Sequence, residues 1–310
     1  MPIAEEISEA TLARARSQGD AGEAWLRQLP LRYAELCARW QLTPGPAVVG
    51  GSASFVRRVT RRDGSAAVLR ISLPDPSFAQ RLATLRAADG HGYVRVLEAD
   101  TDALLLESLG ESLAVTTTDI DRVVRVASSL LTEAWLAPEA TGLGIPEQDG
   151  AVVGLLALIE TELGRITVPV PVDLVEHAKA LLAERQRAWD PTKSVVVHGD
   201  PHADNILAAP PRPGAVGGYV LIDPDGFVAD PAYDLGVLLR GWSDHLVAAD
   251  DPAAEIDRWC AIAAEHTGVD PEAIQQWAFI ERVTTGLHLL GLGLHDLGRS
   301  FLAPAAAVRP

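Results

Sequence analysis

Residues 194–207 read SVVVHGDPHADNIL. Three valines lead into a cluster of polar side chains, which consists of His198, Asp200, His202, Asp204 and Asn205. This stretch decides both the fold and the chemistry. The alternation of histidine and aspartate fits a metal site, whereas the spacing of only some of these residues fits a catalytic loop.

The metal interpretation depends on an extended backbone, in which alternate side chains point to one side. Two imidazoles and a carboxylate could then hold a transition metal such as zinc. Pro201 and the polar residues after it make a regular strand beyond Asp200 unfavourable. The remaining histidines form no second cluster of ligand spacing. A metallohydrolase is therefore the weaker hypothesis, and it predicts stoichiometric zinc or manganese.

The alternative interpretation uses the five-residue step from Asp200 to Asn205, which is the offset of the kinase catalytic loop His-x-Asp-x-x-x-x-Asn. In phosphoryl transfer, a carboxylate must meet the substrate hydroxyl, and an amide oxygen nearby must hold Mg2+ at the phosphates. A second metal-holding carboxylate is needed, from a strand that pairs with the strand leaving the loop. This spacing predicts Asp200 as the catalytic residue and Asn205 as a metal ligand.

The segment YVLIDPDG, residues 219–226, supplies that carboxylate as Asp223, which follows three apolar residues. Asp223 lies 18 positions after Asn205, and the turn-rich connector APPRPGAVGG fills most of the gap. One aspartate after a strand is weak support, but the ordered set is specific. It predicts two metal ligands at one end of a hairpin.

Composition excludes several classes of partner. The 310 residues carry 26 basic and 42 acidic side chains, a formal net charge of −16. Such a surface repels nucleic acid and anionic membranes and favours cationic partners. The longest apolar runs are too short to span a bilayer, and the N-terminus does not resemble a secretory signal. With Cys37 and Cys260 expected to be reduced core residues, we expect a cytoplasmic protein.

Hydrophobic periodicity predicts an α+β chain, in which the spacing of the apolar residues changes between that of helices and that of strands along the sequence. Residues 21–41 are expected to be helical, with a restart at Pro30, and residues 47–72 to form strands with turns at Gly50–Gly51 and Asp63–Gly64. A helix over 77–88 and strands over 93–99 and 103–109 follow. Beyond about residue 118 the pattern is mainly helical. Helix starts are predicted where a capping aspartate precedes proline, at Asp230, Asp251 and Asp270.

The segments VVVHGDPHADNIL (195–207) and VLIDPDGFVADPAYDLG (220–236) resemble the aminoglycoside phosphotransferases, and most of all their streptomycin 6-phosphotransferase and hydroxyurea kinase branch. The resemblance covers roughly residues 20–300. It implies a bilobal protein-kinase-like fold, with a small antiparallel β-sheet N-lobe over 1–108 and a larger, mainly helical C-lobe over 109–310.

The resemblance also implies roles for individual residues. Asp200 would be the catalytic carboxylate, and Asn205 and Asp223 the Mg2+ ligands. His198 would brace the loop backbone rather than bind metal, Gly199 would allow the tight backbone, and Asp234 would support the loop. The ATP contacts would come from Gly50, Gly51, Ser52, Ser54, Val68, Arg70, Glu107 and Leu109.

The sequence departs from the family at one ion pair. Arg70 stands where a phosphate-binding lysine is expected, and the following segment SFAQRLATLRAAD has no glutamate to pair with it. Gln80 or Arg81 occupies about that position. An arginine binds phosphate differently from lysine. The departure keeps open a second hypothesis, a catalytically weak or silent kinase-fold ligand-binding protein.

The intact set of Asp200, Asn205 and Asp223 favours an enzyme. We expect an ATP-dependent small-molecule kinase that phosphorylates a hydroxyl of a cationic antibiotic, a streptomycin-type aminoglycoside above all, with ATP and Mg2+ as cofactors. We expect a monomer or weak dimer that binds no nucleic acid and no membrane. The candidate carboxylates for a cationic acceptor are Asp225, Asp244, Glu281 and Asp296.

Overall fold

The computed structural model describes residues 7–48 and 53–310. The chain divides into two compact units, each with its own internal contacts. The first unit comprises the residues up to 90 together with 94–110, and the second comprises 91–93 together with 111–310. Within the described ranges, no helix is both long and apolar enough to cross a membrane.

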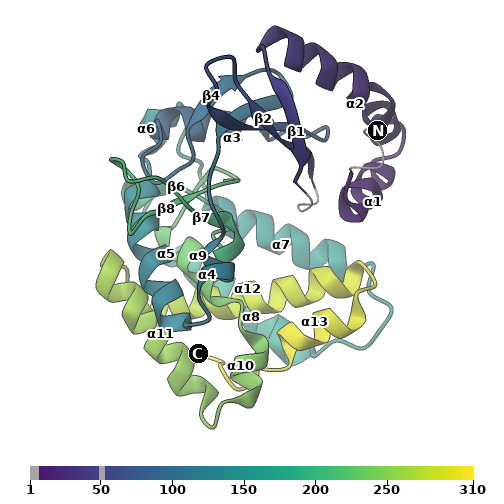
Figure 1. The fold of residues 1–310 in the computed structure, drawn as a ribbon. Coiled ribbons are helices and arrows are strands. Elements are labelled where there is room, and N and C mark those ends of the chain that lie inside the picture. The colour runs from purple at the N-terminus through teal and green to yellow at the C-terminus, as the bar shows by residue number, and fades with distance from the viewer. Residues whose placement is uncertain (1–6, 49–52) are drawn as a thin grey trace. The chain divides into compact units, whose positions relative to one another are not determined.

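The first unit is built around a five-stranded antiparallel sheet with the strand order β1-β2-β3-β5-β4 (Figure 1). The strands are β1 (Thr43–Ala47), β2 (Ser54–Thr60), β3 (Ala66–Ser72), β4 (Val96–Ala99) and β5 (Ala103–Glu107). Alternate residues of β3, namely Ala67, Leu69 and Ile71, are buried, as a half-covered sheet requires. The predicted turn at Asp63–Gly64 is confirmed, and Gly64 has a φ of 84° there.

Strand β1 was not expected, because its sequence TPGPA contains residues that are rare in strands. It lies at the edge of the sheet, where a proline without an N–H is tolerated. Partner strands therefore impose the extended backbone that the local sequence disfavours.

The helices of the first unit are α1 (Glu9–Ser17), α2 (Asp20–Arg39) and α3 (Phe78–Ala88). The predicted restart at Pro30 is wrong, because α2 runs through Pro30 without a break. Pro30 is exposed, while Trp25, Leu29, Tyr33 and Leu36 are buried in the core of the unit. This continuous apolar stripe stabilises the helix on both sides of the proline.

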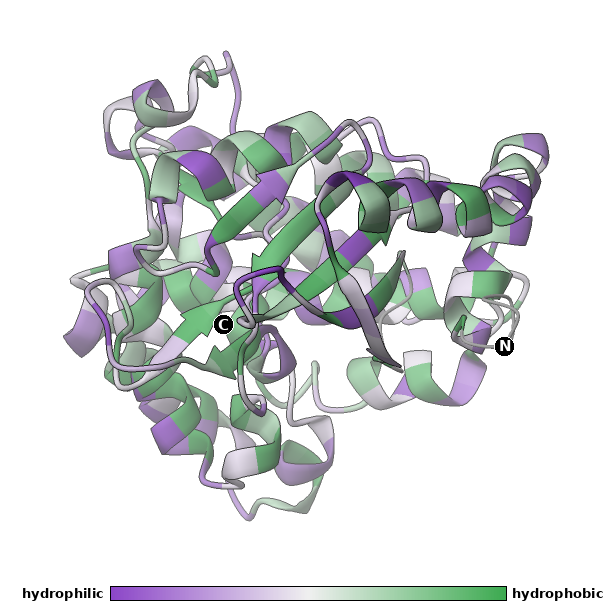
Figure 2. Cartoon of the chain, turned by 45° about the horizontal axis from the view of Figure 1, so that its top comes forward, coloured by the Kyte–Doolittle hydropathy of each residue, from purple (hydrophilic) through white to green (hydrophobic). Residues whose placement is uncertain are grey.

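The second unit contains two short antiparallel strand pairs that frame the loop of interest. Strand β6 (Val195–Val197) pairs with β9 (Phe227–Ala229), and β7 (Ile206–Ala208) pairs with β8 (Tyr219–Leu221). The prediction that the strand leaving the loop pairs with the strand before Asp223 is confirmed. In Figure 2 the strands are mostly hydrophobic, whereas the helices mix hydrophobic and hydrophilic residues.

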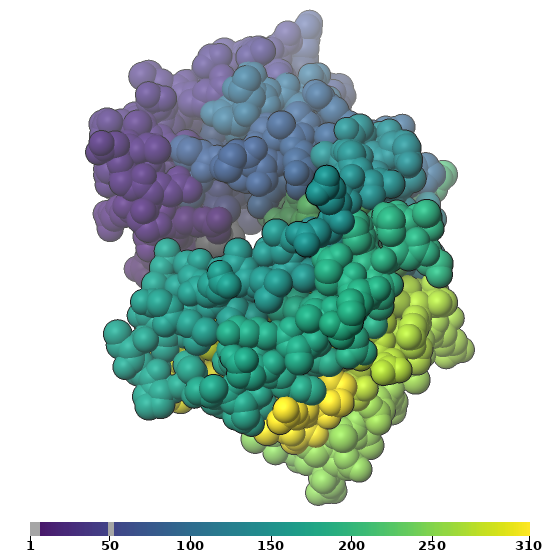
Figure 3. Space-filling model, turned by 180° about the vertical axis from the view of Figure 1, so that it is seen from behind, coloured from purple at the N-terminus to yellow at the C-terminus, as the bar shows by residue number. Residues whose placement is uncertain are grey.

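Helices make up most of the second unit (Figure 1). They are α4 (Leu113–Thr116), α5 (Ile120–Ala134), α6 (Pro138–Thr141), α7 (Gly150–Leu163), α8 (Val172–Ala188), α9 (Pro231–Leu239), α10 (Ser243–Ala248), α11 (Pro252–Thr267), α12 (Pro271–Gly291) and α13 (His295–Leu302). Figure 3 shows a face where the middle of the chain, in teal and green, partly covers the yellow C-terminal helices. Asp230, Asp251 and Asp270 cap α9, α11 and α12 through their side chains, which confirms the predicted starts.

A buried aspartate joins two of these helix starts. Asp149, which is 1% exposed, accepts hydrogen bonds from the N–H groups of Ala151 and Val152 at the start of α7. Its Oδ2 accepts a hydrogen bond from the N–H of Asp230 at 2.8 Å. The side chain of Asp230 in turn accepts from the N–H of Ala232 and so caps α9. The first turns of α7 and α9 are therefore held together by one carboxylate.

Candidate active site

The loop between β6 and β7 brings Asp200 and Asn205 together. A single 3-10 turn over Ala203–Asn205 reverses the chain, and the Nδ2 of Asn205 donates to the carbonyl oxygen of Asp200 at 2.9 Å. This bond orients the amide, so that Oδ1 is the ligand atom that Asn205 can offer. The five-residue step from Asp200 to Asn205 thus corresponds to one loop, which this hydrogen bond closes.

The β7–β8 hairpin brings Asp223 to the end of the loop that carries Asn205. The N–H of Ile222 donates to the carbonyl oxygen of Asn205 at 2.9 Å, which extends the pairing of the two strands. Asp223 itself has a φ of 64°, in the left-handed region that a residue with a side chain seldom adopts. Such backbone strain is concentrated at functional sites. The oxygen ligands of Asn205 and Asp223 are the type that Mg2+ prefers.

His198 is fully buried and uses both ring nitrogens within the loop. Its Nε2 lies 2.8 Å from the carbonyl oxygen of Ile222, and its Nδ1 accepts from the N–H of Asp200 at 3.1 Å. The ring also stacks on Tyr93, with the centroids 5.8 Å apart. His198 is therefore a structural brace, as expected.

These contacts contradict the metal interpretation of the alternating cluster, because His198 has no ring nitrogen left to coordinate a metal. Across residues 7–48 and 53–310, no group of three or more His, Cys, Asp or Glu side chains is arranged to hold a metal ion. His202 instead approaches Asp200, with 3.4 Å between Nε2 and Oδ2, and Asp204 is exposed.

The side chain of Asp234 holds the catalytic loop by binding the backbone of that loop. Its carboxylate is fully buried and accepts three hydrogen bonds of 2.8 Å, from the N–H groups of His198 and Gly199 and from the indole of Trp135. Burial raises the pKa of Asp234 to about 6, although the three donors oppose that shift. The expected support of the loop by Asp234 is therefore confirmed.

Gly199 is the position where the loop needs a glycine. Its φ is 91°, and a Cβ added there would lie 2.7 Å from the Cβ of Asp225. Asp225 approaches so closely because its N–H donates to the carbonyl oxygen of His198 at 2.6 Å. Both the backbone conformation and the space exclude a side chain at position 199.

Arg240 is a site residue that the sequence interpretation missed. Its guanidinium donates to Asp200 Oδ1 at 2.6 Å through Nη2 and to Glu281 Oε2 at 3.0 Å through Nη1. Glu281 is only 3% exposed, so it is committed to Arg240 rather than to an acceptor. One sequence signal could have indicated Arg240, since it is a lone charge within the apolar stretch LGVLLRG, whereas Glu281 was already a candidate carboxylate.

The charges around Asp200 set its protonation state. Burial on its own raises the pKa of Asp200, but the hydrogen bond to His202 and the positive charge of Arg240 outweigh it and lower the pKa to about 2. Asp200 is thus a carboxylate throughout the neutral range.

Of the other candidate carboxylates, Asp225 is half-buried beside the loop, whereas Asp244 and Asp296 are exposed.

Several predicted nucleotide contacts lie in the first unit. Ser54 and Arg70 lie on the neighbouring strands β2 and β3, and the Nε of Arg70 donates to the Oγ of Ser54 at 3.1 Å. Val68 lies two residues earlier on β3. Glu107 ends β5, where its Oε1 accepts from the N–H of Arg95 at 2.8 Å, and a half-buried Leu109 follows. Gly50, Gly51 and Ser52 lie outside the described residues.

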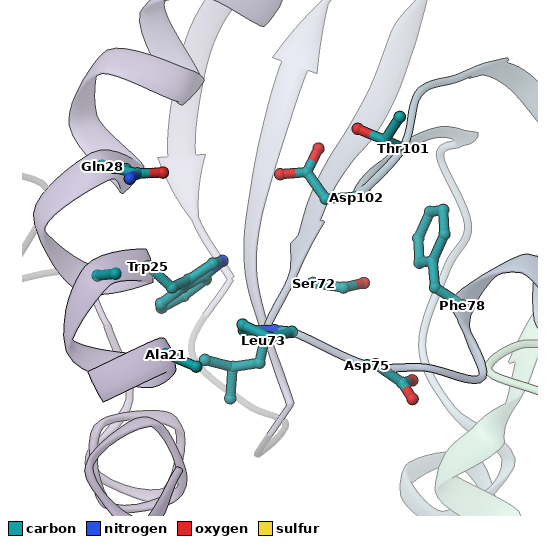
Figure 4. A pocket seen from close by; sticks show the side chains of 11 residues that line it. Ala21, Trp25, Gln28, Ser72, Leu73, Asp75, Phe78, Thr101 and Asp102 are labelled. Carbon is teal, nitrogen blue, oxygen red and sulfur yellow. The ribbon is translucent and has the colours of Figure 1, made fainter. Parts of the chain in front are cut away.

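A cavity of about 270 Å³ in the first unit lies between α2 and the end of β3 (Figure 4). The indole of Trp25, Leu73 and Phe78 provide its apolar lining, and two carboxylates lie at its edge. Asp102 is paired with Arg32 at 2.6 Å, and Asp75 is paired with Arg81 at 3.4 Å. Both carboxylates are therefore already neutralised by the chain.

Comparison with known proteins shows the family to which the chain belongs. Residues 39–290 match the family model described as aminoglycoside/hydroxyurea antibiotic resistance kinase. The chain is 32% identical over 279 residues to the streptomycin 6-kinase of Streptomyces glaucescens, which covers 88% of this chain and 87% of that protein.

Solved structures share the fold at lower identity. An ethanolamine kinase of Plasmodium vivax has a TM-score of 0.60 at 12% identity, covering 86% of this chain and 82% of its own. The GDP and kanamycin complex of APH(2")-IIia has a TM-score of 0.56 at 15% identity, covering 89% and 96%. These likenesses confirm the expected kinase-like fold. The chain belongs to the family of aminoglycoside/hydroxyurea antibiotic resistance kinases, and it is a phosphotransferase that acts on a hydroxyl group.

Proposed function

We propose that the protein transfers the γ-phosphoryl group of ATP to a hydroxyl of a cationic antibiotic, with a streptomycin-type aminoglycoside as the acceptor. The observation that carries this proposal is the constellation of Asp200, Asn205 and Asp223, joined by the loop and hairpin hydrogen bonds. Similarity to a streptomycin 6-kinase over most of its length supports the choice of acceptor.

Asp200 would accept a hydrogen bond from the acceptor hydroxyl and orient its oxygen toward the γ-phosphorus. Because its pKa is lowered to about 2, Asp200 is a weak base and would take the proton late, as the new oxygen–phosphorus bond forms. The bond between the γ-phosphorus and the bridging oxygen breaks, and ADP leaves. Catalysis would come mainly from positioning and charge neutralisation.

Asn205 and Asp223 would hold Mg2+, since an amide oxygen and a carboxylate fit that ion. When bound, Mg2+ neutralises charge on the phosphate oxygens of the nucleotide. The strained backbone of Asp223 supports a functional role for its side chain. The nucleotide itself would contact Gly50, Gly51, Ser52, Ser54, Val68, Arg70, Glu107 and Leu109.

The net charge of −16 supports a cationic acceptor, because a negative field raises the local concentration of polycations. Asp225 is the candidate carboxylate nearest the loop, since its N–H bonds directly to His198. Asp244 and Asp296 remain exposed candidates. A cytoplasmic location and a monomer or weak dimer stay predictions.

The test is ADP release from Mg-ATP with a panel of hydroxylated amines that includes streptomycin, kanamycin and hydroxyurea, with Asp200→Asn as the control. We expect turnover with streptomycin and a loss of about a thousandfold or more in Asp200→Asn, because the hydroxyl is no longer oriented. Turnover that survives this substitution contradicts the role of Asp200.

The second candidate function is a silent kinase-fold binding protein, which the exchange of the usual lysine for Arg70 favours. It predicts no ADP release with any acceptor, whether or not Mg-ATP raises the unfolding temperature. Phosphorylation of one acceptor at a rate that depends on Asp200 excludes it.

A further inference from the structure

Arg282 is a fully buried arginine in the middle of α12. Its Nη2 donates to the carbonyl oxygens of Leu239 at 3.0 Å and Gly241 at 3.1 Å, and its Nη1 donates to the Oγ of Ser243 at 3.0 Å. The two carbonyl groups belong to the residues immediately before and after Arg240. The guanidinium of Arg282 therefore holds the backbone where it leaves α9.

A buried cation needs compensation for the water that it loses. The partners of Arg282 are two carbonyl oxygens and a hydroxyl rather than a carboxylate, and burial lowers its pKa to about 10. The last carbonyl groups of a helix have no partner within the helix, and they carry the negative end of the helix dipole. Arg282 caps α9 at this end, so the buried charge and the carbonyl groups compensate each other.

Two adjacent residues of α12 hold Arg240 in different ways. Glu281 accepts a hydrogen bond from the Nη1 of Arg240 at 3.0 Å, whereas Arg282 binds the carbonyl groups on both sides of it. The Nη2 of Arg240 donates to Asp200 Oδ1 at 2.6 Å. Arg240 is thus fixed both at its backbone and at one of its nitrogens, and supporting hydrogen bonds of this kind keep a site in its productive geometry.

Packing alone does not account for an arginine at position 282. An apolar side chain of similar volume in place of a buried charge is often neutral or stabilising. The helices α9 and α12 already pack closely, since Gly236 lies directly against Trp277. The backbone that leaves α9 includes Trp242, whose φ of 57° lies in the left-handed region. Directed hydrogen bonds hold such a path, and an apolar side chain cannot supply them.

We propose that Arg282 is a positioning residue for phosphoryl transfer, which fixes the backbone on both sides of Arg240 and thereby keeps the Arg240 guanidinium on the Asp200 carboxylate. The proposal rests on the proposed function, because it takes Asp200 as the group that orients the acceptor hydroxyl. Its effect on the rate follows from geometry, since a displacement of about 1 Å in a catalytic group can cost about a hundredfold.

The test is a double-mutant cycle on kcat, measured as ADP release from Mg-ATP with streptomycin. We expect Arg282→Gln to lower kcat about fivefold in the parent chain and to change KM for Mg-ATP less than about twofold, because the contact acts on Asp200. In the Arg240→Gln background the same substitution should change kcat less than about twofold, since the group through which Arg282 acts is already gone. An unchanged kcat in the parent chain, or an equal loss in both backgrounds, overturns the proposal.

The pH dependence of the rate provides a second measurement. When Arg240 is displaced, the pKa of Asp200 rises, so the activity of Arg282→Gln should begin to fall at a higher pH than that of the parent. The matched control is Leu287→Ala, which destabilises α12 at another fully buried position and should alter neither kcat nor the pH profile. Equal changes in the two variants indicate a general loss of stability and overturn the proposal.

A conservative variant covers the case in which Arg282→Gln does not fold. Arg282→Lys keeps the charge but donates from a single nitrogen, so it cannot serve all three acceptors. It should lower kcat about threefold in the parent chain and change it little in the Arg240→Gln background. A loss of the same size in both backgrounds contradicts the proposal here as well.

These outcomes separate the proposal from the proposed function. If no acceptor is phosphorylated, the function fails, but the ionisation of Asp200, followed by NMR of its carboxyl carbon, still shows whether Arg282 holds Arg240 in place. The midpoint should rise in Arg282→Gln and stay at the parent value in Leu287→Ala. If streptomycin is phosphorylated and Arg282→Gln keeps the kcat and pH profile of the parent, the function holds and the positioning role fails.

Discussion

Arg240 donates to the Asp200 carboxylate at 2.6 Å and at the same time to the buried Glu281 at 3.0 Å. One guanidinium therefore fixes two carboxylates that come from distant parts of the chain. This contact orients Asp200 and, together with the hydrogen bond to His202, keeps it ionised, which explains how a partly buried aspartate stays a carboxylate.

Replacing Arg240 by Gln should raise the pKa of Asp200, because burial is then opposed mainly by His202 alone. The ionised fraction is lost as the pH falls, so the activity of the variant should begin to fall at a higher pH than that of the parent. We also expect kcat to fall about tenfold or more at pH 7 from poorer positioning. ADP release as a function of pH measures both effects.

Two further variants control this experiment. Arg240→Gln alone leaves Glu281 buried without its partner, so Arg240→Gln/Glu281→Gln restores the charge balance and should fold. Arg258→Gln removes an arginine from a surface ion pair and should leave the pH profile unchanged. A profile that does not change in either Arg240 variant refutes the positioning role.

The two histidines of the cluster should respond differently to substitution. His198→Ala removes the bonds to Ile222 and Asp200 and should reduce activity about a hundredfold or more, because the loop loses its brace. His202→Ala should cost about tenfold or less, since its contact to Asp200 is longer. Equal losses, accompanied by the loss of bound zinc or manganese, would restore the metal interpretation.

Gly199→Ala should destabilise the protein by more than about 3 kcal/mol, because a strained φ and a collision with Asp225 add together. Gly217 offers a matched control, since it has a φ of 60° but nothing within 4 Å of an added Cβ. Gly217→Ala should cost only about 1 kcal/mol, from the backbone alone. Urea unfolding of both variants measures the difference, and equal costs would argue against the collision.

Asp234 should make stability depend on pH. Its pKa is raised from 3.8 to about 6 in the folded state, so its contribution is complete below about pH 4 and is lost as the pH rises through 6. The loss amounts to about 3 kcal/mol. Asp234→Asn should be less stable throughout and lack this slope in urea unfolding between about pH 4 and pH 7. Identical slopes contradict the assignment.

The parts of the site that could be predicted from the sequence are those set by short spacing. The Asp200–Asn205 step is closed by one hydrogen bond within the loop, and Asp223 follows from a single hairpin. Aspartate caps before proline likewise depend on adjacent residues only. Local chemistry decides these features, so a single sequence contains them.

The features that were missed depend on contacts between distant segments. Neither the passage of α2 through Pro30 nor strand β1 follows from local propensity, because both are imposed by the rest of the first unit. Arg240 meets Glu281 only because α9 lies against α12, where Gly236 contacts Trp277.

The carboxylate of Asp149 has a consequence for local unfolding in the second unit. It joins the first turns of α7 and α9, and α9 carries the aspartate that holds the catalytic loop. Local fraying of either helix start would expose a charged group that is otherwise satisfied, so the two starts should open as one event. The amides of Ala151, Val152, Asp230 and Ala232 should therefore exchange with solvent deuterium at a common rate, and Asp149→Ala should accelerate all four together.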